Sequence, residues 1–196
     1  MKLAFIGSHG VGKTALCYGL AAHLKKIDRT VGLVQEVARD CPMPINRDTT
    51  LNAQLWILHT QIAKEIAAAE RNSVVVCDRS VLDNYAYLVH QVGRRRDLDL
   101  LVAEWLESYT LLIKVPIWQR PRYDGVRATD ITFQEEIDRQ VDALLSEMNP
   151  PVLILDPRGK DGWVVRVLTE LHLPLEPPQG DLFPEEPESG SRLEES

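Results

Sequence analysis

Residues 7–14 read GSHGVGKT, which fits the pattern G-x-x-x-x-G-K-[ST]. The apolar run at residues 3–6 suits a buried strand, and residues 14–27 carry helical periodicity. Glycines in the turn permit backbone angles that point successive N–H groups at one anion. A strand, a glycine-rich turn and a helix in this order predict a cradle for the phosphates of a nucleoside triphosphate.

The residues of this turn have distinct expected roles. The helix N-terminus adds about half a positive charge, and Lys13 is expected to reach the β- and γ-phosphates. The Thr14 hydroxyl suits a Mg²⁺ ligand, so the predicted cofactors are ATP, with GTP as the alternative, and Mg²⁺. The histidine occupies a variable position of the pattern, and its ring is assigned no chemistry. The remaining predicted nucleotide-binding positions are Gly7, Ser8, His9, Gly10, Val11, Gly12 and Ala15.

The composition predicts one soluble domain with a substantial core. The chain has 196 residues, of which 44% are hydrophobic and 26% charged. No apolar stretch approaches the roughly 20 residues that a membrane span requires. The first strand follows Met1 directly, and Cys17, Cys41 and Cys77 form no C-x-x-C pair. We therefore expect a cytoplasmic protein without a signal peptide or a disulfide framework.

Negative charge is concentrated at the C-terminus. Residues 174–196 hold seven acidic side chains against the single Arg192, which accounts for most of the net charge of −7. This segment is rich in Pro, Gly, Ser and Glu, so we expect an acidic, disordered tail after a domain at residues 1–173. The remaining body is nearly neutral, which argues against long nucleic acid as a partner. The sequence leaves open whether the chain forms a homodimer.

Apolar runs and amphipathic segments alternate along the body of the chain. This order predicts an α/β protein, a three-layer fold with a five-stranded parallel sheet covered on both faces. Ligands in such folds bind beyond the carboxyl ends of the strands. The expected strands are residues 2–6, 31–35, 74–77, 111–115 and 152–155. The expected helices are residues 13–27, 50–69, 81–91, 98–108, 132–147 and 162–171.

The third expected strand ends in Asp78, followed by Arg79 and Ser80. A carboxylate at this place is the Walker-B arrangement, and with Thr14 it would complete the protein's share of a Mg²⁺ site. The alternative is that Asp78 or Ser80 caps the following helix. Arg79 could bind the acceptor or the migrating phosphoryl group, or it could instead pair with Asp83 four residues later.

Glu36 lies at the end of the second expected strand, which we expect to adjoin the first. A carboxylate there could accept a proton from an incoming hydroxyl, as a catalytic base does in kinases. Arg39, three residues later, is either its salt-bridge partner or a second contact to the acceptor. An ordinary solvated loop remains the alternative for both residues.

Three arginines follow the fourth expected strand, namely Arg120, Arg122 and Arg127. Phosphoryl transfer builds charge on equatorial oxygens, so we predict that this segment is an arginine lid that closes over the substrate. The alternative is that these are surface arginines pairing with Asp124 and Asp130. Trp118, where the segment begins, could stack on a base or belong to the core.

Two other basic positions lie near turns of the chain. Arg158 follows the fifth strand and is predicted to contribute to the nucleotide-binding set. Residues 94–96 form a triple arginine between two helices, away from any strand end, and we interpret them as a solvated turn.

With these residues in place, the chain resembles the P-loop nucleoside and nucleotide kinases. It is most similar to the AAA-type ATP-binding family that includes the ribosylnicotinamide kinase domain of bifunctional NAD-biosynthesis regulators. The resemblance implies a central phosphate-loop strand, ATP and Mg²⁺ as donor, and a small hydroxyl compound as acceptor. Glu36 matches the glutamate base of deoxynucleoside kinases, and residues 78–80 match their acid-Arg-Ser pattern. The stretches that carry the resemblance are GSHGVGKT (7–14), QEVARDCPMPIN (35–46), QLWILHTQIAKE (54–65), VVVCDRSVLDNYAY (74–87) and YDGVRATDITFQEEIDRQVDALL (123–145).

Three functions fit these observations. The preferred one is a small-molecule kinase, a P-loop phosphotransferase acting on a nucleoside, nucleotide or nicotinamide-riboside-like acceptor. The second is a regulatory ATPase or GTPase that switches partners, although the N-K-x-D motif of GTPases is missing. The third is a 5′-hydroxyl polynucleotide kinase, for which residues 94–96 would be the only basic track.

Overall fold

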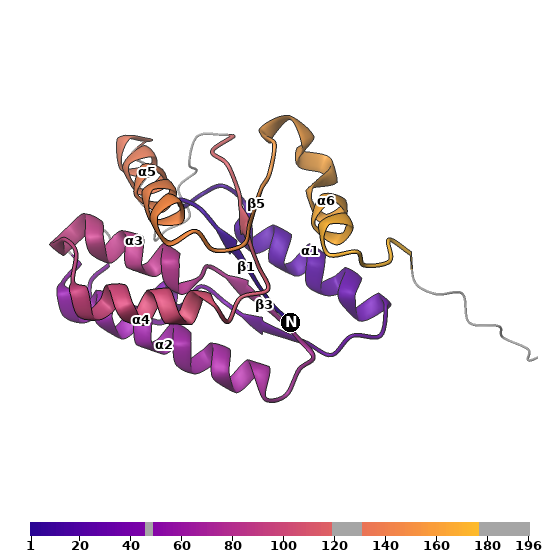
Figure 1. The fold of residues 1–196 in the computed structure, drawn as a ribbon, viewed down its shortest axis with the longest axis horizontal. Helices are drawn as coiled ribbons and strands as arrows, with labels where there is room; N and C mark the ends of the chain where they lie inside the picture. Colours follow the sequence, from indigo (N-terminus) through magenta and orange to yellow (C-terminus); the bar gives the residue numbers. More distant parts are fainter. Residues whose placement is uncertain (46–48, 119–130, 177–196) are drawn as a thin grey trace, which may run out of the picture.

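Short apolar runs become five strands of one parallel sheet in the computed structural model, which describes residues 1–45, 49–118 and 131–176 (Figure 1). The strand order is β2-β3-β1-β4-β5, with the phosphate-loop strand β1 in the centre. This confirms the predicted α/β class and parallel sheet. The strands are β1 (Lys2–Ile6), β2 (Val31–Val34), β3 (Val74–Asp78), β4 (Leu111–Lys114) and β5 (Val152–Ile154).

The predicted helices are present, with ends shifted by at most two residues. Two short 3₁₀ helices, η1 (Val37–Asp40) and η3 (Pro157–Gly162), were not predicted. They are four and six residues long, too short for a periodic pattern to reveal them. The α-helices are α1 (Lys13–Lys26), α2 (Leu51–Ala69), α3 (Val81–Val92), α4 (Arg96–Leu106), α5 (Ile131–Met148) and α6 (Trp163–Glu170).

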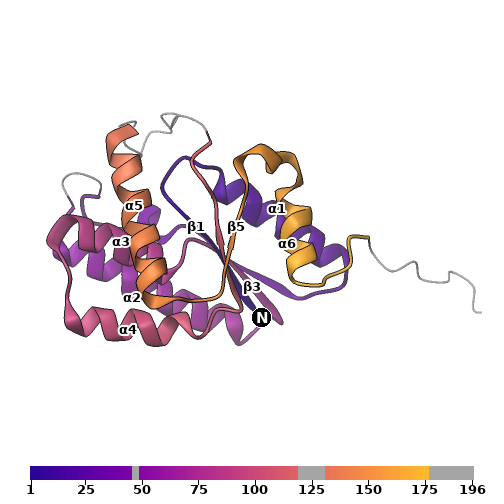
Figure 2. The same cartoon turned by 45° about the horizontal axis from the view of Figure 1, so that its top comes forward.

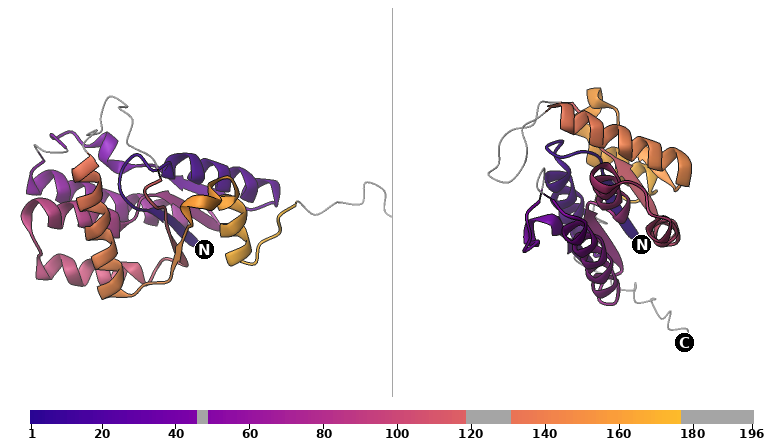
Figure 3. Two further views of the ribbon diagram at one scale, coloured as in Figure 1. Left: turned by 90° about the horizontal axis from the view of Figure 1, so that it is seen from above. Right: turned by 90° about the vertical axis from the view of Figure 1, so that its left-hand side faces the viewer.

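The helices form a layer on each face of the sheet. Helices α2 to α5 cover one face, and α1 and α6 cover the other, as the views in Figures 1 and 3 agree. Strand β1 serves both layers, because Ala4 and Ile6 join the first core cluster while Leu3 and Phe5 join the second. Burial on both faces explains why the strands read as continuous apolar runs.

Strand β2 lies at the edge of the sheet, next to β3 and not next to β1. Our expectation that it adjoins the first strand was wrong. Burial accounts for the order, since all five residues of β3 are buried whereas three of the four residues of β2 retain exposed surface. Strand β3, which is apolar except for Asp78 at its end, therefore takes the inner position between β1 and β2.

The carboxyl ends of β1 and β3 lie at the end of the sheet opposite the N-terminus (Figure 2). Chemistry is expected at this end, where the loops after the strands meet. None of the helices in the described ranges combines the length and apolar character needed to cross a membrane. The predicted acidic tail lies outside the described residues from position 177 onward, so its disorder stays a prediction.

Candidate functional site

The phosphate loop joins β1 to α1 through glycines with positive φ. Gly7 has a φ of 126°, and a Cβ there would lie 2.6 Å from the carbonyl oxygen of Val115, just beyond β4. Gly12 has a φ of 96° and is the N-cap of α1. The positive φ makes any residue other than glycine costly at both positions. At Gly7 the contact with Val115 also leaves no room for a side chain.

Lys13 is folded into this loop. Its Nζ donates hydrogen bonds to the carbonyl oxygens of Gly7 at 2.9 Å and of Ser8 at 2.6 Å. Burial, reinforced by the charge of Arg79, lowers the pKa of Lys13 to about 8, although three nearby carboxylates oppose the shift. The ammonium group therefore lies inside the loop, where it can serve an anion bound by the backbone.

Thr14, in the first turn of α1, meets Asp78, the last residue of β3. The Thr14 hydroxyl donates to Asp78 Oδ2 at 2.5 Å. A hydroxyl and a carboxylate side by side are hard oxygen donors, and Mg²⁺ on a triphosphate needs few protein ligands, so the pair fits this ion. The helix cap is made by Ser80, whose side chain accepts from the N–H groups of Leu82 and Asp83. Asp78 thus does not act as the cap.

Asp83 is a residue of the site that the sequence reasoning missed. Its fully buried carboxylate accepts a hydrogen bond from the N–H of Gly7 at 2.8 Å and from both the N–H and the hydroxyl of Ser80. Burial raises the pKa of Asp83, while the charges of Lys13 and Arg79 act against the shift. The capping-box spacing of Ser80 and Asp83 was the available signal. Asp83 ties the first turn of α3 to the phosphate loop.

Replacement of Asp83 by alanine should destabilise the fold by about 2–4 kcal/mol, because it leaves the buried N–H groups of Gly7 and Ser80 without an acceptor. Urea unfolding followed by circular dichroism measures this loss. Asp97→Ala is the matched control, since Asp97 also lies in a first helical turn but is exposed and pairs with Arg95. A loss no larger than that of the control would contradict the role of Asp83.

Glu36 and Arg79 form a buried ion pair between β2 and β3. Arg79 Nε donates to Glu36 Oε1 at 2.8 Å, and Arg39 Nε donates to Oε2 at 2.9 Å. Arg79 therefore does not form the alternative pair with Asp83, and Arg39 is a salt-bridge partner of Glu36. The Arg79 guanidinium also lies 5.0 Å from the ring centre of Tyr87.

A pocket of about 560 Å³ opens beside this ion pair. Its wall combines apolar side chains with the amide of Gln54 and the ring of Tyr87. Arg79 Nη1 and Asn84 Nδ2 belong to buried side chains of this lining, and neither atom has a hydrogen-bond partner in the described parts of the chain. The wall of the pocket thus contains buried hydrogen-bond donors that no described group satisfies. We call it the acceptor pocket; its lining residues are His9, Glu36, Ala38, Arg39, Ile45, Gln54, Ile57, Arg79, Asn84 and Tyr87.

A second pocket, of about 520 Å³, shares Glu36 and Arg39 with the acceptor pocket. It also includes Thr14 and Asp78, the pair that fits Mg²⁺. Glu36 therefore borders both the Thr14–Asp78 pair and the acceptor pocket. This is the position that a group acting between a bound triphosphate and a second substrate requires.

His9 belongs to the phosphate loop, but its ring faces the acceptor pocket. Nδ1 lies 3.3 Å from the hydroxyl of Tyr87, and the ring centre lies 5.6 Å from that of Phe133 in α5. The His9 carbonyl accepts a hydrogen bond from Gln134 at 2.7 Å. The orientation of this ring follows from the packing of α3 and α5, which the local motif does not reveal.

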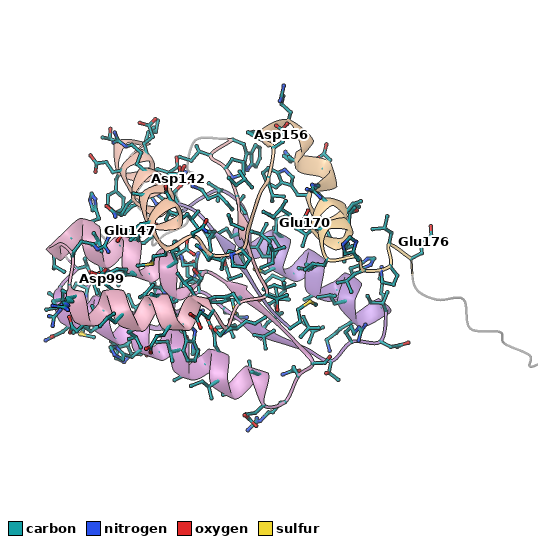
Figure 4. All side chains as sticks on the ribbon, in the orientation of Figure 1. Asp99, Asp142, Glu147, Asp156, Glu170 and Glu176 are labelled. Atoms are coloured by element: carbon teal, nitrogen blue, oxygen red, sulfur yellow. The ribbon has the colours of Figure 1, made fainter. Side chains whose placement is uncertain are left out.

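The other predicted nucleotide-site residues are placed differently. Ala15 is exposed in the first turn of α1. Trp118 donates from Nε1 to the carbonyl of Val11 at 2.9 Å and contacts the ring of Trp163, so it supports the loop from outside. Arg158 is 90% exposed, pairs with Asp156, and lines neither of the two pockets. Asp156 lies at the outer end of the connection between β5 and α6 (Figure 4).

The structure describes one of the two predicted basic clusters, residues 94–96, and not the other. Arg94 pairs with Glu147 and with Asp99, which lie close together in Figure 4, and Arg95 pairs with Asp97. These acidic partners support the interpretation of a solvated turn. The predicted lid residues Arg120, Arg122 and Arg127 lie outside the described residues, so the lid stays a prediction.

The parallel sheet and the glycine-rich phosphate loop after its central strand define an α/β protein with a P-loop fold. The chain belongs to the AAA domain family AAA_28, whose model matches residues 2–161. No curated protein matches the sequence. The narrower resemblance to ribosylnicotinamide kinase domains stays a prediction.

Solved structures with the same fold include deoxyadenosine kinase from M. mycoides. The structure of that enzyme with its products dCMP and a flexible dCDP bound has a TM-score of 0.62 at 14% identity and covers 88% of this chain and 99% of that chain. The structure with bound dATP has the same TM-score and coverage at 15% identity. At such identities the likeness demonstrates the fold alone.

Proposed function

We propose that this protein transfers the γ-phosphoryl group of ATP, with Mg²⁺, to a hydroxyl of a small acceptor. The acceptor classes are a nucleoside, a nucleotide or a nicotinamide-riboside-like compound. The observation that carries the proposal is the Glu36–Arg79 pair, which borders both the Thr14–Asp78 pair and a separate pocket. A protein that only hydrolyses nucleotide has no need for a second pocket of this kind.

The residues divide the chemistry among themselves. The loop backbone and Lys13 would hold the phosphates, and Thr14 and Asp78 would hold Mg²⁺, which neutralises charge on the phosphate oxygens when bound. Each carboxylate oxygen can accept more than one hydrogen bond, so Glu36 would also accept one from an acceptor hydroxyl while it pairs with Arg79 and Arg39. Glu36 then takes the proton of that hydroxyl. Arg79 Nη1 is available to the acceptor or to the migrating phosphoryl group.

The acceptor pocket suits a flat molecule with polar edges. Ala38, Ile45 and Ile57 provide apolar surface, and the ring of Tyr87 can pack against another ring. Asn84 and Arg79 offer donors to hydroxyl or carbonyl oxygens. Deoxyadenosine kinase, with a similar fold, binds dATP and the product dCMP, which supports a nucleoside-like acceptor here.

The predicted arginine lid and Arg158 belong to the same proposal. Arg120, Arg122 and Arg127 would stabilise charge on the transferring group from above the loop. Arg158 would contact the nucleotide from η3, after release from Asp156.

The test is to incubate the protein with γ-labelled ATP and Mg²⁺ against separate nucleosides, nucleotides, nicotinamide riboside and 5′-hydroxyl oligonucleotides. We expect the label to appear on one class of small acceptor. Label found only as free phosphate would favour a regulatory nucleotide hydrolase, and label on oligonucleotides would favour a polynucleotide kinase.

The position of the His9 ring leads to a specific prediction. His9→Ala should raise the KM for the acceptor about ten-fold, because it opens the pocket wall, while the KM for ATP changes little. Steady-state kinetics with each substrate varied in turn measures both constants. His59→Ala, an exposed histidine on α2, is the control. A rise confined to the KM for ATP would place the ring at the nucleotide instead.

A further inference from the structure

The buried face of α2 carries polar side chains where apolar ones are usual. Gln54, Gln61 and Glu65 are at most 5% exposed, and their spacing of seven and four residues places them on one face of the helix. Gln54 lines the acceptor pocket. Gln61 and Glu65 line neither of the two pockets beside Glu36, so the proposed reaction does not yet account for them.

Glu65 is held by four hydrogen-bond donors. Oε1 accepts from the Tyr109 hydroxyl at 2.6 Å and from Gln61 Nε2 at 2.9 Å. Oε2 accepts from Lys2 Nζ and from Trp105 Nε1, both at 2.8 Å. The buried carboxylate thus has a counter-charge and saturated oxygens, which makes it a rigid anchor.

Gln61 connects this anchor to the candidate site. Besides Glu65, its Nε2 donates to the carbonyl oxygen of Arg79 at 3.2 Å. Both partners are acceptors, and the amide nitrogen of Gln61 satisfies them together with its two hydrogens. A leucine or a glutamate at this position would satisfy neither.

The backbone of Arg79 needs such support. Its φ is 92°, in the left-handed region that a residue with a long side chain rarely adopts. Its N–H donates to the carbonyl of Phe5 at 3.2 Å, and its carbonyl is held by Gln61. These two bonds hold the peptide groups on either side of the Arg79 Cα, and so fix the direction in which the guanidinium leaves the backbone toward Glu36.

We propose that Gln61, anchored by Glu65, is a positioning residue that keeps Arg79 in the strained conformation needed to reach Glu36 and the acceptor pocket. This role rests on the proposed phosphoryl transfer. Gln61 does not touch substrate and acts through Arg79. The competing account is that Gln61 and Glu65 only stabilise the core.

Gln61→Met separates the two accounts, because it removes both donated bonds and keeps an unbranched side chain of similar length. Trp105→Phe is the matched control, since it removes one donor from Glu65 Oε2 and leaves Gln61 in place. We expect Gln61→Met to lower kcat about ten-fold at unchanged KM for ATP, and Trp105→Phe to retain wild-type kcat. Equal losses of kcat in the two variants would overturn the proposal.

A double variant tests whether Gln61 acts through Arg79. In an Arg79→Ala background, Gln61→Met should cause no further loss of kcat, because no guanidinium remains to be positioned. If the loss of kcat in the double variant equalled the product of the two single losses, Gln61 would act independently of Arg79, and the proposal would be overturned.

Hydrogen exchange of the Arg79 Nε–H provides a readout that needs no activity. In ¹⁵N-labelled protein this proton should be protected by its bond to Glu36, and Arg79→Lys identifies its signal. We expect faster exchange in Gln61→Met and unchanged exchange in Trp105→Phe. Equal exchange in the wild type and Gln61→Met would overturn the positioning role. If the wild type phosphorylated no acceptor, the proposed function would fail, and this measurement would still decide whether Gln61 holds Arg79.

Discussion

Lys13→Ala is expected to lower phosphoryl transfer by about a thousand-fold or more while the chain remains folded. The ammonium group is the positive charge inside the loop, and its Nζ contacts only the carbonyl oxygens of Gly7 and Ser8 among the bonds seen in the structure. Among the described lysines, Lys13 is the one that donates hydrogen bonds to these loop carbonyls.

The rate of label transfer from ATP, measured beside the thermal unfolding temperature, tests this expectation. Lys13→Met retains most of the side-chain volume, so it separates the loss of the charge from the loss of packing in the alanine variant. Lys64→Ala is the control, because Lys64 is exposed and pairs with Asp40 outside both pockets. Transfer at more than about a tenth of the wild-type rate in both Lys13 variants would contradict the assignment.

Glu36→Gln is expected to lower kcat by about a hundred-fold to ten-thousand-fold while ATP binding is retained. The amide has nearly the shape of the carboxylate but cannot accept a proton at neutral pH. The variant also removes the negative charge that both Arg79 and Arg39 contact, so the unfolding temperature should fall as well.

Binding of a fluorescent ATP analogue and the acceptor-dependent rate together separate the two effects of Glu36→Gln. Asp40→Asn is the matched control, since Asp40 lies four residues away in η1 but is exposed and pairs with Lys64. Full acceptor-dependent turnover in Glu36→Gln would show that Glu36 is not the base. Loss of ATP binding would instead indicate that the carboxylate shapes the nucleotide site.

Most of the fold follows from local patterns in the chain. The runs that become β1 and β3 are apolar except for Lys2 and Asp78 at their ends, because both faces of the sheet are covered. Helices such as α2 and α5 are long enough for their periodicity to be unambiguous. The position of β2 was wrong because strand order depends on burial between elements distant in the chain. The turn η1 was missed because one helical turn has no repeat.

The residues of the candidate site also fall into two groups, those predictable from the local sequence and those that depend on tertiary packing. Residues directly after strands, such as Asp78, Arg79 and Glu36, were accessible to prediction because parallel strands end at one edge of the sheet. Gln61 and Glu65 were not, because polar residues within a helix resemble a solvated face until the packing is known. The His9 ring was likewise unpredictable, since its direction depends on Tyr87 and Phe133.

The close contact between Gly7 and the carbonyl of Val115 affects how active and inactive relatives can be told apart by sequence. Its missing side chain is required by the carbonyl of Val115, a contact within the protein that exists without any nucleotide. A relative that had drifted into a pseudokinase would therefore keep this glycine for the sake of folding. Lys13, whose expected role is to bind the phosphates and whose Nζ otherwise donates only to loop carbonyls among the bonds seen in the structure, would be freer to change in such a lineage. Retention of the lysine, more than of the glycine, is the better marker of surviving catalysis.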